Sequence, residues 1–192
     1  MGLRTAPWGQ EVNKMRADRP SLLESPTTRI ARLVGANYLP PYWIWLTEVR
    51  TKTGWSSTWG DDLDSERYID GFAFALVPSK NFQRIAYEFK VSRSDWLAEL
   101  KNPVKKAPAY FLSHQFWYVV LPGVIDIEND FAREVKGRRV VTANPDGCGI
   151  IVVQPDDSLD ILVHATKRHP FPMPETFVAS LLRRAAKVNG GY

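Results

Sequence analysis

The chain has 192 residues, of which 44% are hydrophobic and 24% are charged, a composition typical of a folded globular domain. Its net charge of +4 and its pI near 9.2 are compatible with a nucleic-acid partner but do not by themselves indicate one. The lone Cys148 excludes an intramolecular disulfide and a cysteine-rich zinc site, and it predicts a reducing, cytoplasmic location. No apolar run approaches the roughly 20 residues that cross a bilayer, so we expect neither secretion nor a membrane span.

The first part of the chain divides into an extension and the start of a domain. Residues 1–27 are polar and basic and end in Ser25-Pro26-Thr27, a capping and turn sequence. We expect a single domain over residues 28–192. It opens with a short helix from Thr28 to Ala36, because apolar residues recur there at helical spacing, and Pro40-Pro41 ends this segment.

Three strands are predicted next. They cover Tyr42–Arg50, Tyr68–Val77 and Arg84–Val91, and the last two are joined by turn residues at 78–81. The second strand is apolar on both faces apart from Asp70, as expected in the middle of a sheet. Alternation in the third strand separates two faces, one with Ile85, Tyr87, Phe89 and Val91 and the other with Ala86, Glu88 and Lys90.

The remainder alternates helices and strands. We expect a helix that starts at Asp95, is capped by Ser94 and turns Trp96, Leu97 and Leu100 inward. Further elements are a helical stretch from Pro103 toward Ser113, strands at Phe116–Leu121, Gly149–Val153 and Asp160–His164, a polar insertion over 126–146 and a final helix at Pro174–Val188. This order predicts an α/β (α+β) fold with a mixed central β-sheet flanked by helices.

Asp70, Glu88 and Lys90 are the residues that indicate chemistry. Hydrolysis of a phosphodiester needs a hard divalent cation such as Mg²⁺ or Mn²⁺, carboxylates that hold it, and a cation that stabilises the transition state. If strands 68–77 and 84–91 form a hairpin, Asp70 shares a face with the other two when it pairs with Glu88 or with Lys90, but not when it pairs with Phe89. The alternative is a solvated Glu88–Lys90 couple, which is the commoner origin of an E-x-K tripeptide.

Other candidates lie around this set. Glu48, at the end of the preceding strand, is either a further carboxylate near the metal or an exposed strand-end residue. Candidate DNA-binding residues, whose alternative is a plain helix cap or a solvated charged face, are Arg93, Ser94, Lys101, Lys105 and Lys106, with Arg183, Arg184 and Lys187 on the last helix. Of the seven tryptophans, Trp55 and Trp59 are better placed for base stacking than those in the predicted core.

The run from Tyr87-Glu88-Phe89-Lys90 through Ser92, Asp95 and Trp96 to Glu99-Leu100-Lys101 resembles a stretch of the MmcB-type, DNA-repair-associated PD-(D/E)XK proteins and their phage-encoded relatives. Upstream, Thr47-Glu48-Val49 and Tyr68-Ile69-Asp70 are similar to the glutamate and aspartate strands of that family. The likeness extends in blocks over residues 28–188.

The resemblance implies a restriction-endonuclease-like core, with Asp70 and Glu88 as metal ligands, Lys90 as the catalytic lysine and Glu48 at the preceding acidic position. The function expected from it is a Mg²⁺- or Mn²⁺-dependent deoxyribonuclease of DNA repair or phage DNA metabolism, in a bacterial cell or a phage-infected host, with DNA as partner and a homodimer as an open alternative. Two other readings remain open: a catalytically weak DNA-binding module of the same fold, with repair or phage proteins as partners, and a phage-type interaction protein that inhibits or recruits a host factor.

Overall fold

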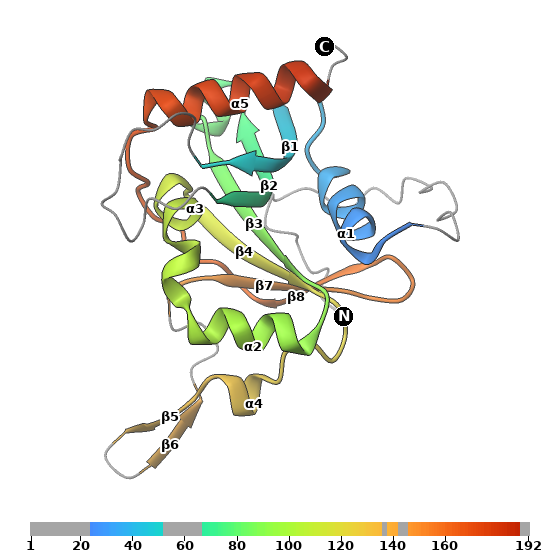
Figure 1. Ribbon diagram of the computed structural model, residues 1–192, viewed down its shortest axis with the longest axis vertical. Coiled ribbons are helices and arrows are strands. Elements are labelled where there is room, and N and C mark those ends of the chain that lie inside the picture. The colour runs from blue at the N-terminus through green and yellow to red at the C-terminus, as the bar shows by residue number, and fades with distance from the viewer. Residues whose placement is uncertain (1–23, 52–66, 136–137, 142–145, 189–192) are drawn as a thin grey trace.

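A six-stranded mixed sheet forms the centre of the protein, whose computed structural model describes residues 24–51, 67–135, 138–141 and 146–188 (Figure 1). The strand order is β1-β2-β3-β4-β7-β8. The sheet is antiparallel from β1 to β3, parallel from β3 to β7, and antiparallel again at β8. The strands are β1 (Trp43–Arg50), β2 (Tyr68–Ala75), β3 (Arg84–Lys90), β4 (Gln115–Val120), β7 (Gly149–Val153) and β8 (Leu159–Val163).

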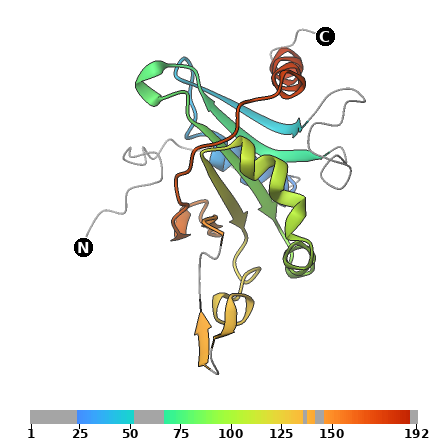
Figure 2. The ribbon, with the colours of Figure 1, turned by 90° about the vertical axis from the view of Figure 1, so that its left-hand side faces the viewer.

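Helices cover both faces of this sheet and give three layers (Figures 1 and 2). On one face, α1 buries Ile30 and Val34 against the strands, and on the other, α2 and α5 bury Trp96 and Phe177. The described residues form five α-helices: α1 (Pro26–Gly35), α2 (Arg93–Lys101), α3 (Ala107–Leu112), α4 (Ile127–Asp130) and α5 (Glu175–Val188). The predicted mixed α/β architecture is therefore confirmed.

The hairpin of β2 and β3 has one of the two registers that the candidate site requires. The 3₁₀ turn η1 (Pro78–Lys80) joins the strands, and Asn81 after it takes a left-handed conformation with φ of 52°. Gly71 pairs with Tyr87, and Phe72 pairs with Ala86. Continued by one residue, this register sets Asp70 opposite Glu88, so both carboxylates lie on one face of the sheet.

Helix α2 differs from the prediction in its start and in its buried face. Its N-cap is Ser92, whose hydroxyl accepts a hydrogen bond from the Asp95 N–H, instead of Ser94. Leu97 and Leu100, expected to be inward, are 39% and 38% exposed. The residue that points inward one turn after Trp96 is Glu99, which is 5% exposed.

The polar insertion over 126–146 contains elements that its composition did not predict. Asp126 caps the short helix α4, and a separate two-stranded sheet follows, formed by β5 (Ala132–Val135) and β6 (Arg138–Val141). Short polar strands carry too little apolar alternation to be recognised from sequence. The helical stretch predicted from Pro103 toward Ser113 consists of the 3₁₀ helix η2 (Pro103–Lys106) followed by α3.

Some predictions lie outside the described residues. They include the extension up to residue 23 and the loop tryptophans Trp55 and Trp59. Within the described ranges, no helix is long and apolar enough to cross a bilayer.

The register of β2 depends on the absence of a side chain at Gly71. A Cβ atom at this position would overlap the indole ring of Trp45 and touch the ring of Phe89 at 3.0 Å. We expect Gly71→Ala to lower the free energy of unfolding by about 1 to 3 kcal/mol, the usual cost of overpacking. Urea denaturation measures this cost. Because the clash is with Trp45, the cost should shrink in a Trp45→Leu background, and an undiminished cost there would contradict this explanation.

Candidate active site

The hairpin brings Asp70, Glu88 and Lys90 together at the edge where β3 ends. Asp70 Oδ2 accepts a hydrogen bond of 2.8 Å from the backbone N–H of Phe89, which fixes the carboxylate across the two strands. Lys90 Nζ lies 2.9 Å from Glu88 Oε1. The alternative of a solvated Glu88–Lys90 couple does not describe this pair, because the Lys90 side chain is only 6% exposed.

Helix α2 contributes two more carboxylates to the same ammonium group. Lys90 Nζ lies 3.2 Å from Glu99 Oε2 and 3.5 Å from Asp95 Oδ1. We call Asp70, Glu88, Lys90, Asp95 and Glu99 the carboxylate–lysine cluster. With all groups ionised it carries four negative charges and one positive charge. The cluster is therefore electrostatically incomplete and favours a further cation or a bound proton.

The pKa values of the cluster reflect this imbalance. Burial raises the pKa of Glu88 to about 7, and the neighbouring charge of Asp70 adds to the effect while Lys90 opposes it. Burial also raises the pKa of Asp70, against the hydrogen bond from Phe89. For Lys90, burial favours the neutral amine, but the carboxylates of Glu88, Glu99 and Asp95 prevail and raise its pKa. Lys90 therefore stays charged, and the two strand carboxylates repel each other.

The donor set of the cluster suits a hard divalent cation. Among the described residues, no group of three or more His, Cys, Asp or Glu side chains is arranged to hold a metal ion. Asp70 and Glu88 are two carboxylates on facing strands, and Mg²⁺ is commonly bound by one or two carboxylates, with water and substrate phosphate as its other ligands. The residues present therefore fit such an ion, which would also relieve the repulsion between the two carboxylates.

Glu48 lies in a separate, basic groove under α5. It occupies a kink of β1, with φ of 51°, between the pairs Thr47–Gly71 and Val49–Ile69. Its carboxylate is 74% exposed and lies 3.3 Å from Arg184 Nη2. We call the surrounding cavity of about 400 Å³ the α5 groove; it is lined by Glu48, Arg50, Tyr68, Ser180, Arg183, Arg184 and Lys187.

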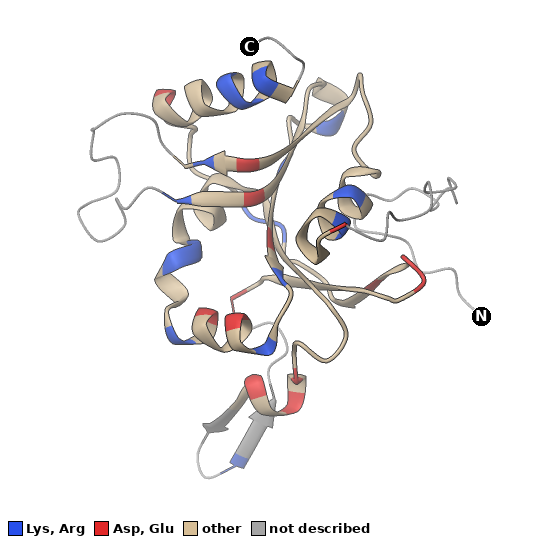
Figure 3. Ribbon diagram, turned by 45° about the vertical axis from the view of Figure 1, so that its right-hand side comes forward, with Lys and Arg blue, Asp and Glu red and all other residues tan. Residues whose placement is uncertain are grey.

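The α5 groove adjoins the carboxylate–lysine cluster through β2. Tyr68 precedes Asp70 by two residues and lies on the same face of the strand. Four cationic side chains line the groove against the single carboxylate of Glu48, and Figure 3 shows basic residues on α5 above acidic residues on the neighbouring strands. Arg184, predicted to point outward, packs on β1 and donates to the Thr47 carbonyl oxygen at 2.6 Å. The groove is thus an anion-attracting surface beside a cation-attracting one.

Two of the predicted DNA-binding side chains are engaged within the protein. Arg93 forms a two-pronged ion pair with Asp130 and also donates to the Val124 carbonyl oxygen. Lys106 Nζ lies 2.7 Å from Asp146 Oδ2. Lys101 and Lys105 are exposed, and Ser94 is exposed beside the Ser92 cap. Of the five candidates between residues 93 and 106, only these three are displayed to a partner without first breaking an ion pair of the described chain.

Sequence reasoning missed two residues of the cluster, Asp95 and the buried Glu99. The signal for Glu99 was its spacing of three residues from Trp96, the most buried residue of the helix. A buried carboxylate at such a position requires a partner, and Lys90 and Tyr118 both provide one. The predicted inward positions of Leu97 and Leu100 hid this signal.

Comparisons with known proteins identify no activity. No family model matches the sequence, and no curated protein is similar to it. Among solved structures, the chain is similar to SPO1766, a protein of unknown function from Silicibacter pomeroyi, with 18% identity and a TM-score of 0.49 over 88% of this chain and 94% of that one. A likeness of this degree supports no functional argument, so the site is interpreted from its own geometry.

Glu88 should make the metal-free protein less stable as the pH rises. Because its pKa is raised from 4.5 to about 7 in the folded state, its stabilising contribution is complete below pH 4.5 and is lost as the pH rises through 7. The shift corresponds to on the order of 2 to 3 kcal/mol. We expect Glu88→Gln, which cannot ionise, to gain about this much relative to the wild type between about pH 5 and pH 7.5. Urea unfolding in EDTA measures the difference.

The comparison with the variant is needed because His114 acts in the opposite direction. Burial lowers the pKa of His114 to about 4, so its contribution is lost as the pH falls, in both proteins alike. The contribution of His114 therefore cancels when the unfolding free energy of the wild type is subtracted from that of the variant. A difference that stays constant over the pH range would contradict the interpretation of Glu88.

Proposed function

We propose that the protein is a Mg²⁺- or Mn²⁺-dependent nuclease that hydrolyses phosphodiester bonds of DNA, and that its sheet and helices are a restriction-endonuclease-like core. One observation carries the proposal: just beyond the Gly71–Tyr87 pair of the β2–β3 hairpin, the Asp70 carboxylate bonds to the Phe89 N–H, beside the ion pair of Glu88 and Lys90. Two acidic oxygen donors beside a buried ammonium are the groups that metal-assisted hydrolysis of a phosphodiester needs. A structural ion pair alone would not require Asp70.

Asp70 and Glu88 would hold the metal ion in this account. The ion supplies an activated water molecule and neutralises charge on the phosphate. Glu88 is already the hydrogen-bond acceptor of Lys90, so its carboxylate is oriented before any ligand binds. Asp70 is oriented in the same way by the Phe89 N–H. The protein therefore contributes two carboxylates in fixed positions, which lowers the entropic cost of assembling the site.

Lys90 would stabilise negative charge as it develops on the phosphate. Its ammonium has three N–H donors, and the contacts with Glu88, Glu99 and Asp95 hold it at the cluster in the charged form. A cation fixed in a poorly solvated site stabilises a transition-state charge more strongly than one in water. Glu99 and Asp95 act through Lys90 and are positioning residues.

The α5 groove supports DNA as the substrate. The cavity is lined by Tyr68, two residues before Asp70 in β2, and by four cationic side chains, Arg50, Arg183, Arg184 and Lys187. These would bind phosphates on one side of the scissile bond. Exposed Lys101 and Lys105 extend the basic surface from the other side of the cluster. The wider role in DNA repair or phage DNA metabolism, inside a bacterial or phage-infected cell, belongs to this proposal as its cellular setting.

A DNA-binding module without efficient turnover is the second candidate. The observation that favours it is the engagement of Lys90, whose ammonium already compensates three carboxylates, together with a basic groove that needs no metal ion to attract DNA. In that case the cluster would be a structural network that holds α2 on the sheet. Salt-sensitive DNA binding without cleavage under any divalent metal ion distinguishes this candidate from the nuclease.

Cleavage of supercoiled plasmid and of circular single-stranded DNA tests the nuclease. We expect nicking with Mg²⁺ or Mn²⁺ that EDTA abolishes. Asp70→Asn should lower the rate by at least about 100-fold, since loss of a ligand costs more than loss of its supporting contacts. The amide oxygen still accepts the hydrogen bond from Phe89 and relieves the repulsion with Glu88, so the variant should fold at least as well as the wild type.

Asp160→Asn is the matched control, because Asp160 lies in β8, outside the cluster, and is bonded to Gln154. Its cleavage rate should equal that of the wild type. Equal rates for Asp70→Asn and Asp160→Asn in the presence of Mg²⁺ or Mn²⁺ would remove Asp70 from the mechanism. Cleavage by the wild type that persists in EDTA would remove the metal ion from it.

A further inference from the structure

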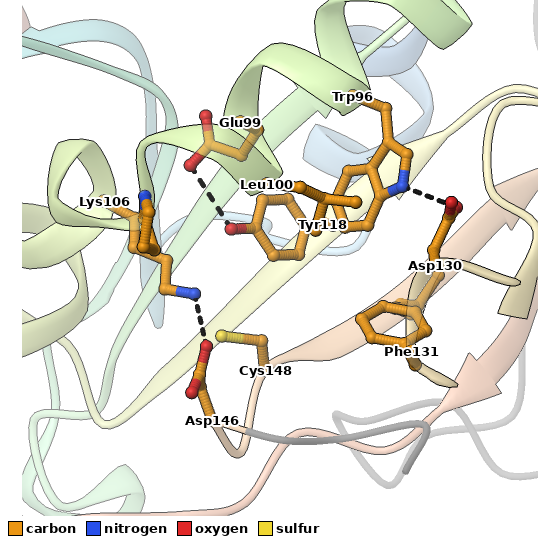
Figure 4. A pocket seen from close by; sticks show the side chains of 11 residues that line it. Trp96, Glu99, Leu100, Lys106, Tyr118, Asp130, Phe131, Asp146 and Cys148 are labelled. Carbon is orange, nitrogen blue, oxygen red and sulfur yellow. Dashed lines mark hydrogen bonds and ion pairs between the residues drawn. The ribbon is translucent and has the colours of Figure 1, made fainter. Parts of the chain in front are cut away.

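A second cavity lies directly beside the carboxylate–lysine cluster, beneath α2 and η2 and above β4 and β7 (Figure 4). It has a volume of about 320 Å³, at the lower end of the range for small-molecule sites. Its lining combines apolar and aromatic side chains with a few charged ones: Trp96, Glu99, Leu100, Pro103, Lys106, Tyr118, Asp130, Phe131, Asp146, Cys148 and Ile150. We call it the α2 pocket.

Glu99 and Tyr118 form the wall between the α2 pocket and the cluster. Glu99 Oε2 lies 3.2 Å from Lys90 Nζ, while its other oxygen accepts a hydrogen bond of 3.4 Å from the Tyr118 hydroxyl. Tyr118 is also the β4 partner of Glu88 in the parallel register. A phosphate bound by Lys90 and by a metal ion on Glu88 would thus have the pocket one strand away.

The interior of the pocket suits a flat, unsaturated ring. The Trp96 and Tyr118 rings meet edge to face with centroids 5.0 Å apart, and Phe131 packs against Trp96 at 5.9 Å. Leu100 and Ile150 add apolar surface. Aromatic and apolar walls of this kind bind rings by stacking and by exclusion of water.

The polar groups of the pocket complement the edge of such a ring. The Glu99 carboxylate accepts hydrogen bonds, and Lys106, held by Asp146 at 2.7 Å, donates them. Burial raises the pKa of Cys148 to about 11, so its thiol is neutral and serves as apolar lining, neither as a nucleophile nor as a metal ligand. An aliphatic chain would offer no hydrogen-bonding group to Glu99 and Lys106, and a sugar would offer no flat ring to the aromatic side chains.

We propose that the α2 pocket binds one unstacked nucleobase, adjacent to the phosphate that the carboxylate–lysine cluster binds. The inference rests on the proposed function and names its substrate class: nucleic acid that presents an unpaired base beside the scissile bond. A fully stacked duplex has to unstack a base at a cost of a few kcal/mol before that base can enter. Single-stranded or locally distorted DNA is therefore the preferred substrate.

Binding of matched oligonucleotides tests the proposal without cleavage. One duplex carries a single extrahelical base, a second carries an abasic site at the same position, and fluorescence anisotropy in EDTA compares them. We expect wild-type protein to bind the first at least about tenfold more tightly, since stacking of one base contributes roughly 1 to 3 kcal/mol. A competition experiment with free deoxynucleotides distinguishes a base within DNA from a free nucleotide as the ligand. Competition at micromolar concentration would show that the pocket binds a free nucleotide and would overturn the proposal that it binds a base of DNA.

Leu100→Trp and Leu97→Trp form a matched pair of variants. Both leucines lie in α2 with 38% and 39% exposure, and only Leu100 lines the pocket. The larger side chain at 100 should fill the pocket and abolish the tenfold preference, whereas the same change at 97 should preserve it. Thermal denaturation of both variants checks that each is folded.

Equal binding of the two duplexes by the wild type, or equal effects of the two variants, would overturn the α2 pocket as a base site. These outcomes are separable from failure of the nuclease. If the protein cleaves plasmid but shows no base preference, the nuclease proposal stands and the base-binding proposal is wrong. If it shows the base preference but no metal-dependent cleavage, the base-binding proposal stands and the nuclease proposal is wrong.

Discussion

The ion pairs of Lys90 are the interaction on which the rest of the site depends. A buried ammonium costs several kcal/mol of hydration unless carboxylates compensate it, and at Lys90 this compensation comes from β3 and from α2 at once. The need to reach Lys90 explains why Glu99 points inward where a leucine was expected. The ion pair between Glu99 and Lys90 holds α2 over the sheet, and the Tyr118 hydroxyl donates a hydrogen bond to Glu99. The position of the helix, the cluster and the wall of the α2 pocket all follow from this single charge.

The surroundings of the cluster divide the surface by charge. On the side of β1 and α5, a groove with four cationic side chains attracts phosphates. On the side of α2, an aromatic pocket with one acid and one amine offers a place for a base. Between them lies the carboxylate–lysine cluster, where Asp70 and Glu88 would hold the proposed divalent cation. A single strand of DNA laid across the three regions would meet a backbone contact, a reactive centre and a base contact in that order.

The sequence predicted the elements of the fold more fully than their packing. The turn residues at 78–81 and the alternation in the third strand indicated the hairpin, and the hypothesis of one shared polar face for Asp70, Glu88 and Lys90 required one of two registers. For α2, the burial of Trp96 was predicted correctly, but Leu97 was expected inside in place of Glu99. Hydrophobicity ranks leucine above glutamate, and no local rule reports that Lys90 lies opposite. Likewise the sequence offered Arg93 as a candidate phosphate contact or part of a plain helix cap, and did not reveal its ion pair with Asp130, 37 residues further along the chain. Pairings between distant segments decide where charged side chains go, and composition does not reveal them.

Anomalous diffraction from crystals soaked in Mn²⁺ tests most directly the claim that the hairpin register creates a metal site. The account predicts one strong anomalous peak within bonding distance of a carboxylate oxygen of both Asp70 and Glu88, and its loss in crystals of Asp70→Asn. A peak held by Glu48 in the α5 groove, or no peak near Asp70 and Glu88 at saturating Mn²⁺, would contradict it.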